Sequence, residues 1–398
     1  MRLSLVERIS DLSPDAWARL DPGRSPFMEL PFLEALEHSG SVGAATGWSP
    51  LFVTAWSDEG ALVGAVPAFV KAHSYGEYIF DWGWARGAQA AGIDYYPKLV
   101  VAAPFTPATG RRILLAPDAG PEVMPSLIAA TVDVAKQLRL SSVHWLFVTD
   151  EERAVLEQMG FLTRLTTQYH WENAGFSDFE GFLGTMRSKR RREVRRERAQ
   201  VAEAGIQVRM LTGPEMQDRH WAAADDFYRH TCGRKWNDPY LEPGFFERIR
   251  ATFADRVVFC SAERDGVVLA GSLFFRRNDA LYGRYWGRRD DVQVKGLHFD
   301  VCYYAPIEWA IQQGIQLYEA GAQGEHKIAR GFLPSPIHSA HWIADPRLAG
   351  GVARFLQDES AHTAVVMEAL EQRGPFRRGD DGPLPAGPAI TVDPATPS

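Results

Sequence analysis

The sequence has few cysteines, a mildly acidic charge balance and no long apolar run, and each of these absences narrows the possible functions. Cys232, Cys260 and Cys302 contain no CxxC pair, so they offer no cysteine-based zinc site and favour a reducing, cytoplasmic location. The formal net charge of -7 argues against general coating of nucleic acid, and we expect no DNA partner. The apolar runs are too short for stable membrane insertion, and the first residues do not resemble a secretory signal.

What is present is the composition of a globular protein, with 45% hydrophobic residues, in a chain long enough for two domains. We expect these domains at residues 1–175 and 176–378. Residues 379–398 are rich in proline and glycine and poor in large apolar side chains, which predicts a disordered tail.

The two halves share an order of elements. Each shows helices, then an antiparallel meander, then a long helix followed by one more strand. The long helices are expected at 122–140 and 299–314, and the strands that follow them at 142–148 and 315–321. Such an order predicts an α/β fold with mixed sheets, built twice.

The second half opens with the basic segment "SKRRREVRRERAQ", residues 188–200. We expect a helix that starts after Ser188 and ends at Gly205. At helical spacing, one of its faces carries arginines without an acid among them: Arg191, Arg192, Arg195 and Arg198. This pattern suits forked contacts to phosphate oxygens, but it is also typical of a solvated linker helix, and the sequence leaves both interpretations open.

Residues 73–115 form a long aromatic and polar stretch with little helix or strand periodicity. A loop of this kind is predicted to line a ligand site, although an aromatic satellite core beneath a loop is the alternative. Its candidate substrate-binding residues are His73, Tyr75, Glu77, Asp81, Trp82, Tyr96 and Lys98.

A second dense stretch runs from residue 286 to residue 342, and within it Glu319 lies at the end of a predicted buried strand. Titratable groups just beyond a strand's carboxyl end are typical of ligand sites in α/β sheets. Glu325 or His326 could take a proton from an amine, and Lys327 could stabilise an oxyanion. The other candidates are Tyr304 as proton donor and Arg284, His298, Glu319 and Arg330 as substrate-binding residues.

Histidines are the remaining candidates for a metal site. The four considered are His298, His326, His338 and His341. They fit no carboxylate–histidine motif of known spacing, so no metal is expected and each is interpreted as a hydrogen-bonded structural residue.

Five sequence stretches carry a family resemblance. "HSYGEYIFDW", "YYPKL", "PFTP", "HFDVCYYAPIEWAI" and "GAQGEHKIARGFLP…SAHW" resemble the FemAB-like predicted N-acyltransferases, which are related to the peptidoglycan-bridge aminoacyltransferases. The resemblance runs from about Leu5 to Arg378. It implies two tandem GNAT-like domains, in agreement with the repeated order of elements.

The resemblance also implies a reaction. In GNAT-type enzymes an amine attacks an acyl thioester or ester directly, without a covalent enzyme intermediate, and the sequence shows no GxSxG pattern. We therefore expect transfer of an acyl or aminoacyl group to an amine acceptor such as a cell-wall precursor or another phosphorylated small molecule. No permanently bound cofactor is expected, and acyl-CoA or aminoacyl-tRNA would be the co-substrate.

Two other functions stay open. The peptidoglycan-bridge relatives carry a long helical arm in their second domain, and its absence from this sequence makes tRNA the less favoured partner. An aminoacyl-tRNA-dependent transferase is nevertheless one alternative. The other is a non-catalytic protein that recognises its ligand through duplicated GNAT-like domains.

Overall fold

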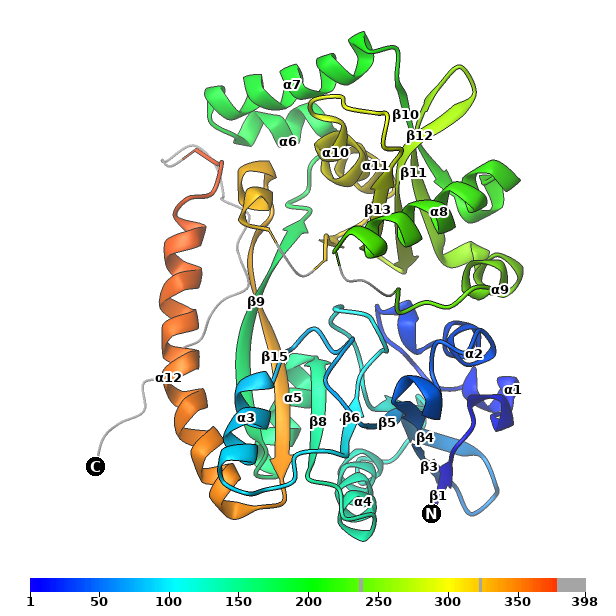
Figure 1. Ribbon diagram of the computed structural model, residues 1–398, viewed down its shortest axis with the longest axis vertical. Helices are drawn as coiled ribbons and strands as arrows, with labels where there is room; N and C mark the ends of the chain where they lie inside the picture. The colour runs from blue at the N-terminus through cyan, green and yellow to red at the C-terminus, as the bar shows by residue number, and fades with distance from the viewer. Residues whose placement is uncertain (236–238, 322–323, 378–398) are drawn as a thin grey trace.

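The computed structural model describes residues 1–235, 239–321 and 324–377, which form an elongated α/β molecule of two stacked halves (Figure 1). The tail expected at 379–398 lies outside the described residues. An 11-stranded sheet runs through both halves, and a four-stranded sheet flanks it in the first half. Both sheets are packed against helices, which confirms the predicted α/β class with mixed sheets.

The first half contains the four-stranded sheet, part of the large sheet and five α-helices among its described residues. The four-stranded sheet has the order β1-β3-β4-β7, and the first half's share of the large sheet has the order β8-β6-β5-β2. The strands are β1 (Arg2–Val6), β2 (Trp48–Pro50), β3 (Phe52–Trp56), β4 (Leu62–Val66), β5 (Ala68–Lys71), β6 (Lys98–Val101), β7 (Leu114–Leu115) and β8 (Ser142–Val148). The helices are α1 (Pro14–Trp17), α2 (Leu30–His38), α3 (Trp82–Ala90), α4 (Val123–Gln137) and α5 (Asp150–Gln158).

The second half continues the large sheet in the order β10-β11-β12-β13-β14. Its strands are β10 (Gln207–Thr212), β11 (Val257–Arg264), β12 (Val267–Arg277), β13 (Ala280–Arg288) and β14 (Leu317–Glu319). Its helices are α6 (Phe179–Thr185), α7 (Ser188–Glu203), α8 (Asp218–Lys235), α9 (Phe245–Thr252), α10 (Leu297–Phe299) and α11 (Ala305–Gln312). Each half contains one parallel strand pair, β6 with β8 and β13 with β14, in an otherwise antiparallel sheet.

Two long strands join the halves. Strand β9 (Leu162–Glu172) pairs with β14 of the second half, and β15 (Leu333–Ile343) pairs with β8 of the first half. The two strands also pair with each other over nine positions, from Leu333 opposite His170 to His341 opposite Leu162. This β9–β15 ribbon crosses the boundary between the halves in both directions, with the final helix α12 (Pro346–Glu371) alongside it (Figure 1).

The halves also share an apolar core. Phe27 of the first half packs edge-on against Phe275 and Tyr282 of the second half, with ring centroids 5.4 Å away in both cases. Phe32 contacts Phe245 in the same way. All five side chains are buried, so separating the halves would expose a continuous aromatic surface. The domain boundary predicted at residue 175 stays a prediction, because the halves pack together across it.

Four elements were not foreseen: α3, β6, β15 and α12. The stretch 73–115, expected to be mostly loop, contains helix α3 and strand β6. Strand β15 was not predicted because it contains Pro334 and Pro336, and proline normally interrupts a sheet. Both prolines lie where β15 pairs only with β9, because pairing with β8 begins at His338, so neither has to donate a hydrogen bond toward β8.

Helix α12 was also missed, although its start carries a recognisable signal. Asp345 accepts hydrogen bonds from the backbone N–H groups of Arg347 and Leu348, and Pro346 occupies the first helical position. An Asp–Pro pair of this kind is typical of a helix N-terminus.

Candidate functional site

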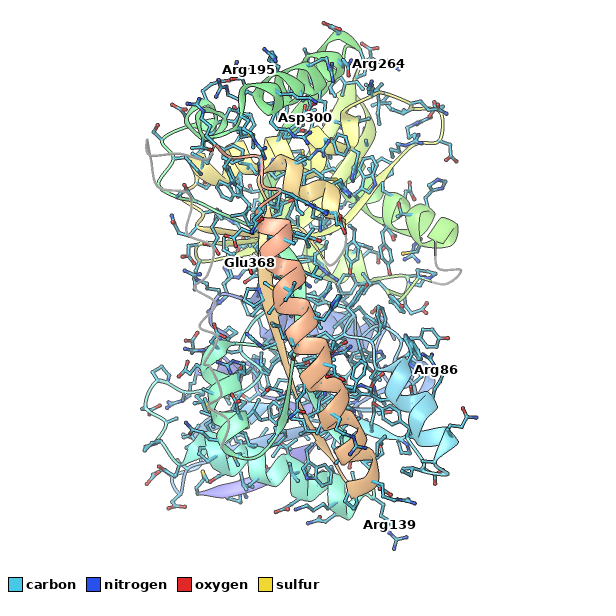
Figure 2. All side chains as sticks on the ribbon, turned by 90° about the vertical axis from the view of Figure 1, so that its left-hand side faces the viewer. Arg86, Arg139, Arg195, Arg264, Asp300 and Glu368 are labelled. Atoms are coloured by element: carbon cyan, nitrogen blue, oxygen red, sulfur yellow. The ribbon has the colours of Figure 1, made fainter. Side chains whose placement is uncertain are left out.

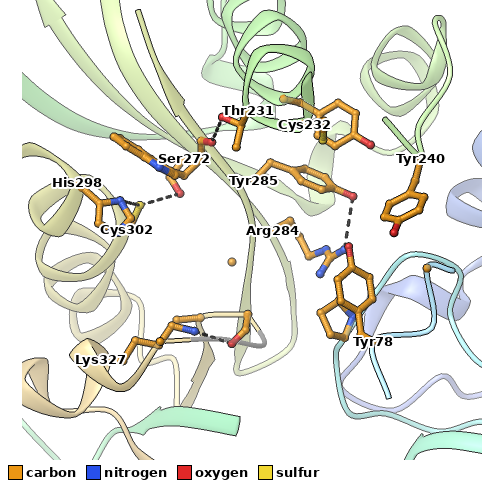
Figure 3. Close-up of a pocket in the computed structure, with 18 of the residues that line it drawn as sticks. Tyr78, Thr231, Cys232, Tyr240, Ser272, Arg284, Tyr285, His298, Cys302 and Lys327 are labelled. Atoms are coloured by element: carbon orange, nitrogen blue, oxygen red, sulfur yellow. Dashed lines mark hydrogen bonds between the residues drawn. The ribbon is translucent and has the colours of Figure 1, made fainter. Parts of the chain in front are cut away.

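Strands β13 and β14 separate soon after they meet. They pair in parallel only over Ala280–Tyr282 and Leu317–Glu319. Strand β13 then continues to Arg288, whereas the chain beyond Glu319 turns into a 3-10 turn, Glu325–Arg330. A pocket of about 1370 Å³ lies at this divergence, closed on its other side by residues of the first half (Figure 3).

Aromatic rings form a large part of the pocket wall. The first half contributes Tyr75, Tyr78, Phe80 and Trp82, and the second half contributes Tyr228, Tyr240, Tyr285, Trp286, Tyr303 and Tyr318. Flat rings from two sides favour a ligand with an extended planar or apolar part.

Among the side chains of Arg, His, Lys, Asp and Glu, only basic ones line the described pocket wall. Arg284, His298, His326 and Lys327 reach the pocket, and no Asp or Glu is present among the described lining residues. In a chain of net charge -7, this lining gives the pocket a local electrostatic preference for neutral or anionic ligands.

Lys327 is the most perturbed of these basic groups. Its Nζ donates a hydrogen bond to the Gly321 carbonyl at 2.6 Å, and the side chain is otherwise buried without a carboxylate partner in the described chain. Burial lowers the pKa of Lys327 to about 7. Near neutral pH this lysine can therefore exist as a cation or as a free amine.

His326 lies next to Lys327 and is held in a hydrogen-bonded contact. Its Nε2 lies 2.9 Å from the hydroxyl oxygen of Tyr303. Burial, together with the charges of Arg330 and Lys327, lowers the pKa of His326 below its ordinary value, so the imidazole is neutral near pH 7. Arg330 holds this turn by donating to the His326 carbonyl at 2.8 Å.

Cys302 lies on the same wall but is not an activated nucleophile. Its Sγ is 3.4 Å from His298 Nδ1 and 3.7 Å from Ser272 Oγ (Figure 3). Burial raises the pKa of the Cys302 thiol to about 12, so it stays protonated near neutral pH. This agrees with direct transfer without a covalent enzyme intermediate.

A π-helical turn, Asp300–Tyr304, places these groups between α10 and α11. In a regular α-helix the Cys302 carbonyl would accept from the N–H of residue 306, but Pro306 has none. The Tyr318 hydroxyl supplies the missing donor at 2.5 Å. Strand β14 is thus fastened to the turn that carries Cys302 and Tyr303, and such turns are frequent at functional sites.

Several residues that the sequence predicts in the site lie elsewhere in the structure. Tyr304 points to α7, where its hydroxyl donates to Glu197, and its neighbour Tyr303 lines the pocket instead. Glu325 is a surface residue, with 69% of its side chain exposed and Arg373 4.0 Å away. Arg330 stacks over Phe299 behind the turn.

Glu319 faces away from the pocket because successive strand residues alternate between faces, and its neighbours Tyr318 and Ala320 are the ones that line it. Its Oε2 accepts from the Thr109 backbone N–H at 3.2 Å, while Oε1 has no partner in the described chain. Burial raises the pKa of Glu319 to about 8.

A second group of predicted residues forms a buried ionic cluster behind the pocket wall. Lys98 Nζ donates to Glu77 Oε2 and to Ser74 Oγ, each at 2.8 Å, and also to Asp81. The Ser74 hydroxyl contacts that of Tyr96 at 2.8 Å.

Protonation in this cluster follows from burial and from charge. Burial by itself would lower the pKa of Lys98, but Glu77 and Asp81 outweigh it and raise that pKa. The cluster fixes both ends of the 74–81 segment, which carries Tyr75, Tyr78 and Phe80 into the pocket. These charged residues therefore hold the wall, while Tyr75 and Trp82 form it.

The arginine face of α7 does not reach the pocket, and the prediction that it is unopposed is wrong for two of its members. Arg195 contacts Glu180 at 2.5 Å, and Arg198 contacts Glu308 at 2.7 Å. Acids from other elements, which helical spacing within α7 cannot reveal, provide these partners. Arg191 donates instead to the Met186 carbonyl at 2.7 Å.

The four histidines considered for a metal site do not come together, and His73 lies apart from the pocket. His298 and His326 lie at the pocket with ring centroids 6.0 Å apart, whereas His341 contacts His144 and His338 contacts Asp150. His73 Nε2 lies 3.0 Å from the Thr46 carbonyl oxygen, outside the pocket lining. Within the described residues, no three His, Cys, Asp or Glu side chains are grouped to hold a metal ion.

Comparison with known proteins gives a consistent fold. A family model named FemAB-like and described as peptidoglycan biosynthesis/recognition matches residues 8–378. No curated protein matches the chain. The crystal structure of FemX superposes with a TM-score of 0.53 at 11% identity, covering 89% of this chain and 100% of that one.

Two further solved structures are similar. A conserved protein of unknown function from Bacteroides thetaiotaomicron VPI-5482 has a TM-score of 0.51 at 11% identity, covering 86% of this chain and 100% of that one. L-PGS from Bacillus licheniformis has a TM-score of 0.49 at 13% identity, covering 87% and 96%. The α/β class with mixed sheets agrees with these comparisons, and the expectation of two tandem GNAT-like domains stays a prediction. Over the described residues, no helix is long and apolar enough to cross a membrane.

Proposed function

The chain belongs to the FemAB-like family, and from this premise we propose that it is an N-acyltransferase that works in the pocket between β13 and β14. The observation that carries the proposal is the meeting of His326 and Lys327 at that pocket. One offers a neutral imidazole as a proton acceptor, and the other offers an amine that can meet developing negative charge.

The proposed step begins when a neutral amine attacks the carbonyl carbon of the acyl donor. A C–N bond forms and the carbonyl oxygen becomes an oxyanion, toward which protonated Lys327 directs an N–H. His326 accepts the proton that the amine nitrogen loses, and the Tyr303 hydroxyl orients its ring. The C–S or C–O bond of the donor then breaks, and the leaving group takes up that proton.

The pocket lining supports a choice of substrate class. Basic groups without a lining carboxylate suit an anionic or phosphorylated ligand, and the aromatic wall suits its ring or acyl part. The family description supports a cell-wall precursor as the amine acceptor. We propose acyl-CoA or aminoacyl-tRNA as co-substrate, with no permanently bound cofactor, and the cytoplasm as location.

Mass spectrometry of ligands retained by the purified protein tests the substrate class directly. A donor screen with CoA thioesters and charged tRNA, using the retained ligand or a cell-wall precursor as acceptor, then tests transfer. Formation of an amide product is expected. A retained ligand that is never acylated would contradict the enzyme proposal and favour a recognition protein.

A further inference from the structure

We propose that helix α7 docks the protein reversibly onto an anionic lipid surface. The proposal is independent of the transfer chemistry. It starts from a stripe of exposed cations, Lys189, Arg192 and Arg196, on the side of α7 opposite the buried Val194 and Val201. For these three side chains, the described chain contains no hydrogen-bond or ion-pair partner.

Three more cations extend the stripe without losing their charge. Arg187 donates to the carbonyls of Gly374 and Pro375, and Arg377 donates to the Met186 carbonyl at 3.3 Å. Arg191 donates to the same Met186 carbonyl. Backbone carbonyls orient a guanidinium but do not neutralise it. The six residues that we call the cationic patch are Arg187, Lys189, Arg191, Arg192, Arg196 and Arg377.

The acids near the patch are already engaged. Glu193 pairs with Arg190 at 2.6 Å, and Glu180 pairs with Arg195. Glu197 accepts from Tyr304 and from Arg330 on the inner side of the helix. Glu203 is exposed at the far end of the helix, beyond the stripe. The patch therefore keeps about six positive charges, within the range of basic clusters that bind anionic lipid headgroups.

The position of α7 favours a flat partner. The helix lies across one end of the molecule's longest axis, so its outer side is the outermost surface there (Figures 1 and 2). A plane can meet all of this surface while the acidic remainder of the chain points away from it. An extended nucleic acid would run past one helix width and meet the net negative charge of the rest.

The chemistry of the stripe also sets the type of binding. It carries no large apolar side chain, so it cannot insert into the acyl region as an amphipathic anchor does. Attraction is purely electrostatic, requires anionic headgroups and falls as salt shortens the screening length. The inner side of α7 meanwhile reaches the pocket turn, since Glu197 binds Arg330 and Arg330 holds the His326 carbonyl.

The test is sedimentation of the full chain with phosphatidylcholine vesicles that contain or lack phosphatidylglycerol. Binding is expected only with phosphatidylglycerol and is expected to disappear at about 0.5 M salt. The triple variant Lys189→Gln, Arg192→Gln, Arg196→Gln should bind roughly 100-fold more weakly. The matched control Arg86→Gln, Arg139→Gln, Arg354→Gln removes the same charge outside the patch and should bind like the wild type.

Each other result overturns the proposal. These results are absence of binding to anionic vesicles, equal loss in both triple variants, or full binding by the patch variant. Binding of tRNA through the patch, without binding to vesicles, would assign α7 to nucleic acid instead. Circular dichroism of both variants checks the fold, which is expected to be unchanged because the substituted side chains contact no partner in the described chain.

Discussion

Burial gives Lys327 a chemistry that an exposed lysine lacks. With its pKa at about 7, it exchanges protons near neutral pH, and it does so next to a neutral histidine on the wall of one pocket. Sequence analysis located both residues because a titratable cluster follows a predicted strand. The sequence left the base open between Glu325 and His326, because which of these side chains turns inward depends on the 3-10 turn.

Variants of the pocket turn should separate catalytic from neighbouring residues. His326→Asn is expected to lower kcat by roughly 100- to 10,000-fold through loss of the proton acceptor. Lys327→Met is expected to lower it by roughly 100- to 1000-fold through loss of oxyanion stabilisation. The measurement is kcat with the donor and acceptor found in the screen.

Two neighbouring residues provide the controls for these variants. Glu325→Gln changes an exposed carboxylate and Tyr304→Phe changes a hydroxyl outside the pocket, so both should stay within a few-fold of wild-type kcat. Loss of activity in Glu325→Gln, with His326→Asn active, would return the role of base to Glu325.

Glu319 allows a stability prediction with a definite sign. Its pKa is about 8 in the folded chain against an ordinary value of 4.5, so the folded state binds more protons between these values and loses stability as pH rises through that window. Glu319→Gln removes this cost. It should raise the free energy of unfolding by about 5 kcal/mol near pH 9 and by little near pH 4.

Urea unfolding across this pH range measures the effect. The exposed Glu325→Gln variant is the control and should keep the wild-type pH dependence. A Glu319→Gln protein that is less stable at pH 9 would show that the ionised carboxylate has a stabilising partner, contrary to its unpaired Oε1.

At the scale of elements, the π-helical turn shows where sequence periodicity stops being informative. The pattern of residues 299–314 predicts one continuous helix, and the structure divides it into α10, the turn and α11. The π-helical turn rotates the side chains away from the positions that a regular α-helix would give them. Tyr303 therefore lines the pocket, although Tyr304 was the predicted site residue. In the sequence, only Pro306 indicates that the helix is interrupted.

The bond between strand β14 and this turn can be tested on its own. Tyr318→Phe leaves the buried Cys302 carbonyl without its donor and should lower the free energy of unfolding by roughly 1–3 kcal/mol. In a Pro306→Ala background, residue 306 regains an N–H, so the same tyrosine change should cost less. A double-mutant cycle from denaturant unfolding measures this coupling, and strict additivity would contradict it.

Sequence analysis recovered most elements that have strong periodicity of their own. Strand β8 lies at residues 142–148 as expected, and α7 spans Ser188–Glu203, with a left-handed Gly205 two residues beyond its end. The failures, α3, β6, β15 and α12, have short or interrupted patterns whose stability comes from neighbours distant in sequence. Their positions depend on tertiary contacts that local propensity does not encode.

At the scale of the whole molecule, the repeat seen in the sequence does not produce two separable bodies. Residues 1–175 contain β8 and β9, but the strand that pairs with both of them is β15. The buried contacts of Phe27 with Phe275 and Tyr282 add a shared core. The order of elements along the chain indicates the repeat. Only the structure shows that each half contributes a strand that pairs with the other half, β9 with β14 and β15 with β8.

A fragment of residues 1–175 should therefore not fold by itself. It lacks β15, so β8 has one bare edge and β9 has no partner strand at all. We expect weak near-UV circular dichroism and no cooperative thermal transition, whereas the full chain should unfold in one transition. A monomeric fragment with a sharp transition would show that β15 is dispensable to the first half.

The β9–β15 ribbon also bears on how the chain is made. When β9 leaves the ribosome, residues 173–343 must still be synthesised before its partner strand β15 is complete, a delay of roughly 10–30 s at ordinary elongation rates. During that interval the first half presents unpaired strand edges, which are templates for association with other nascent chains. The first half is therefore completed by a strand that is synthesised after nearly all of the second half.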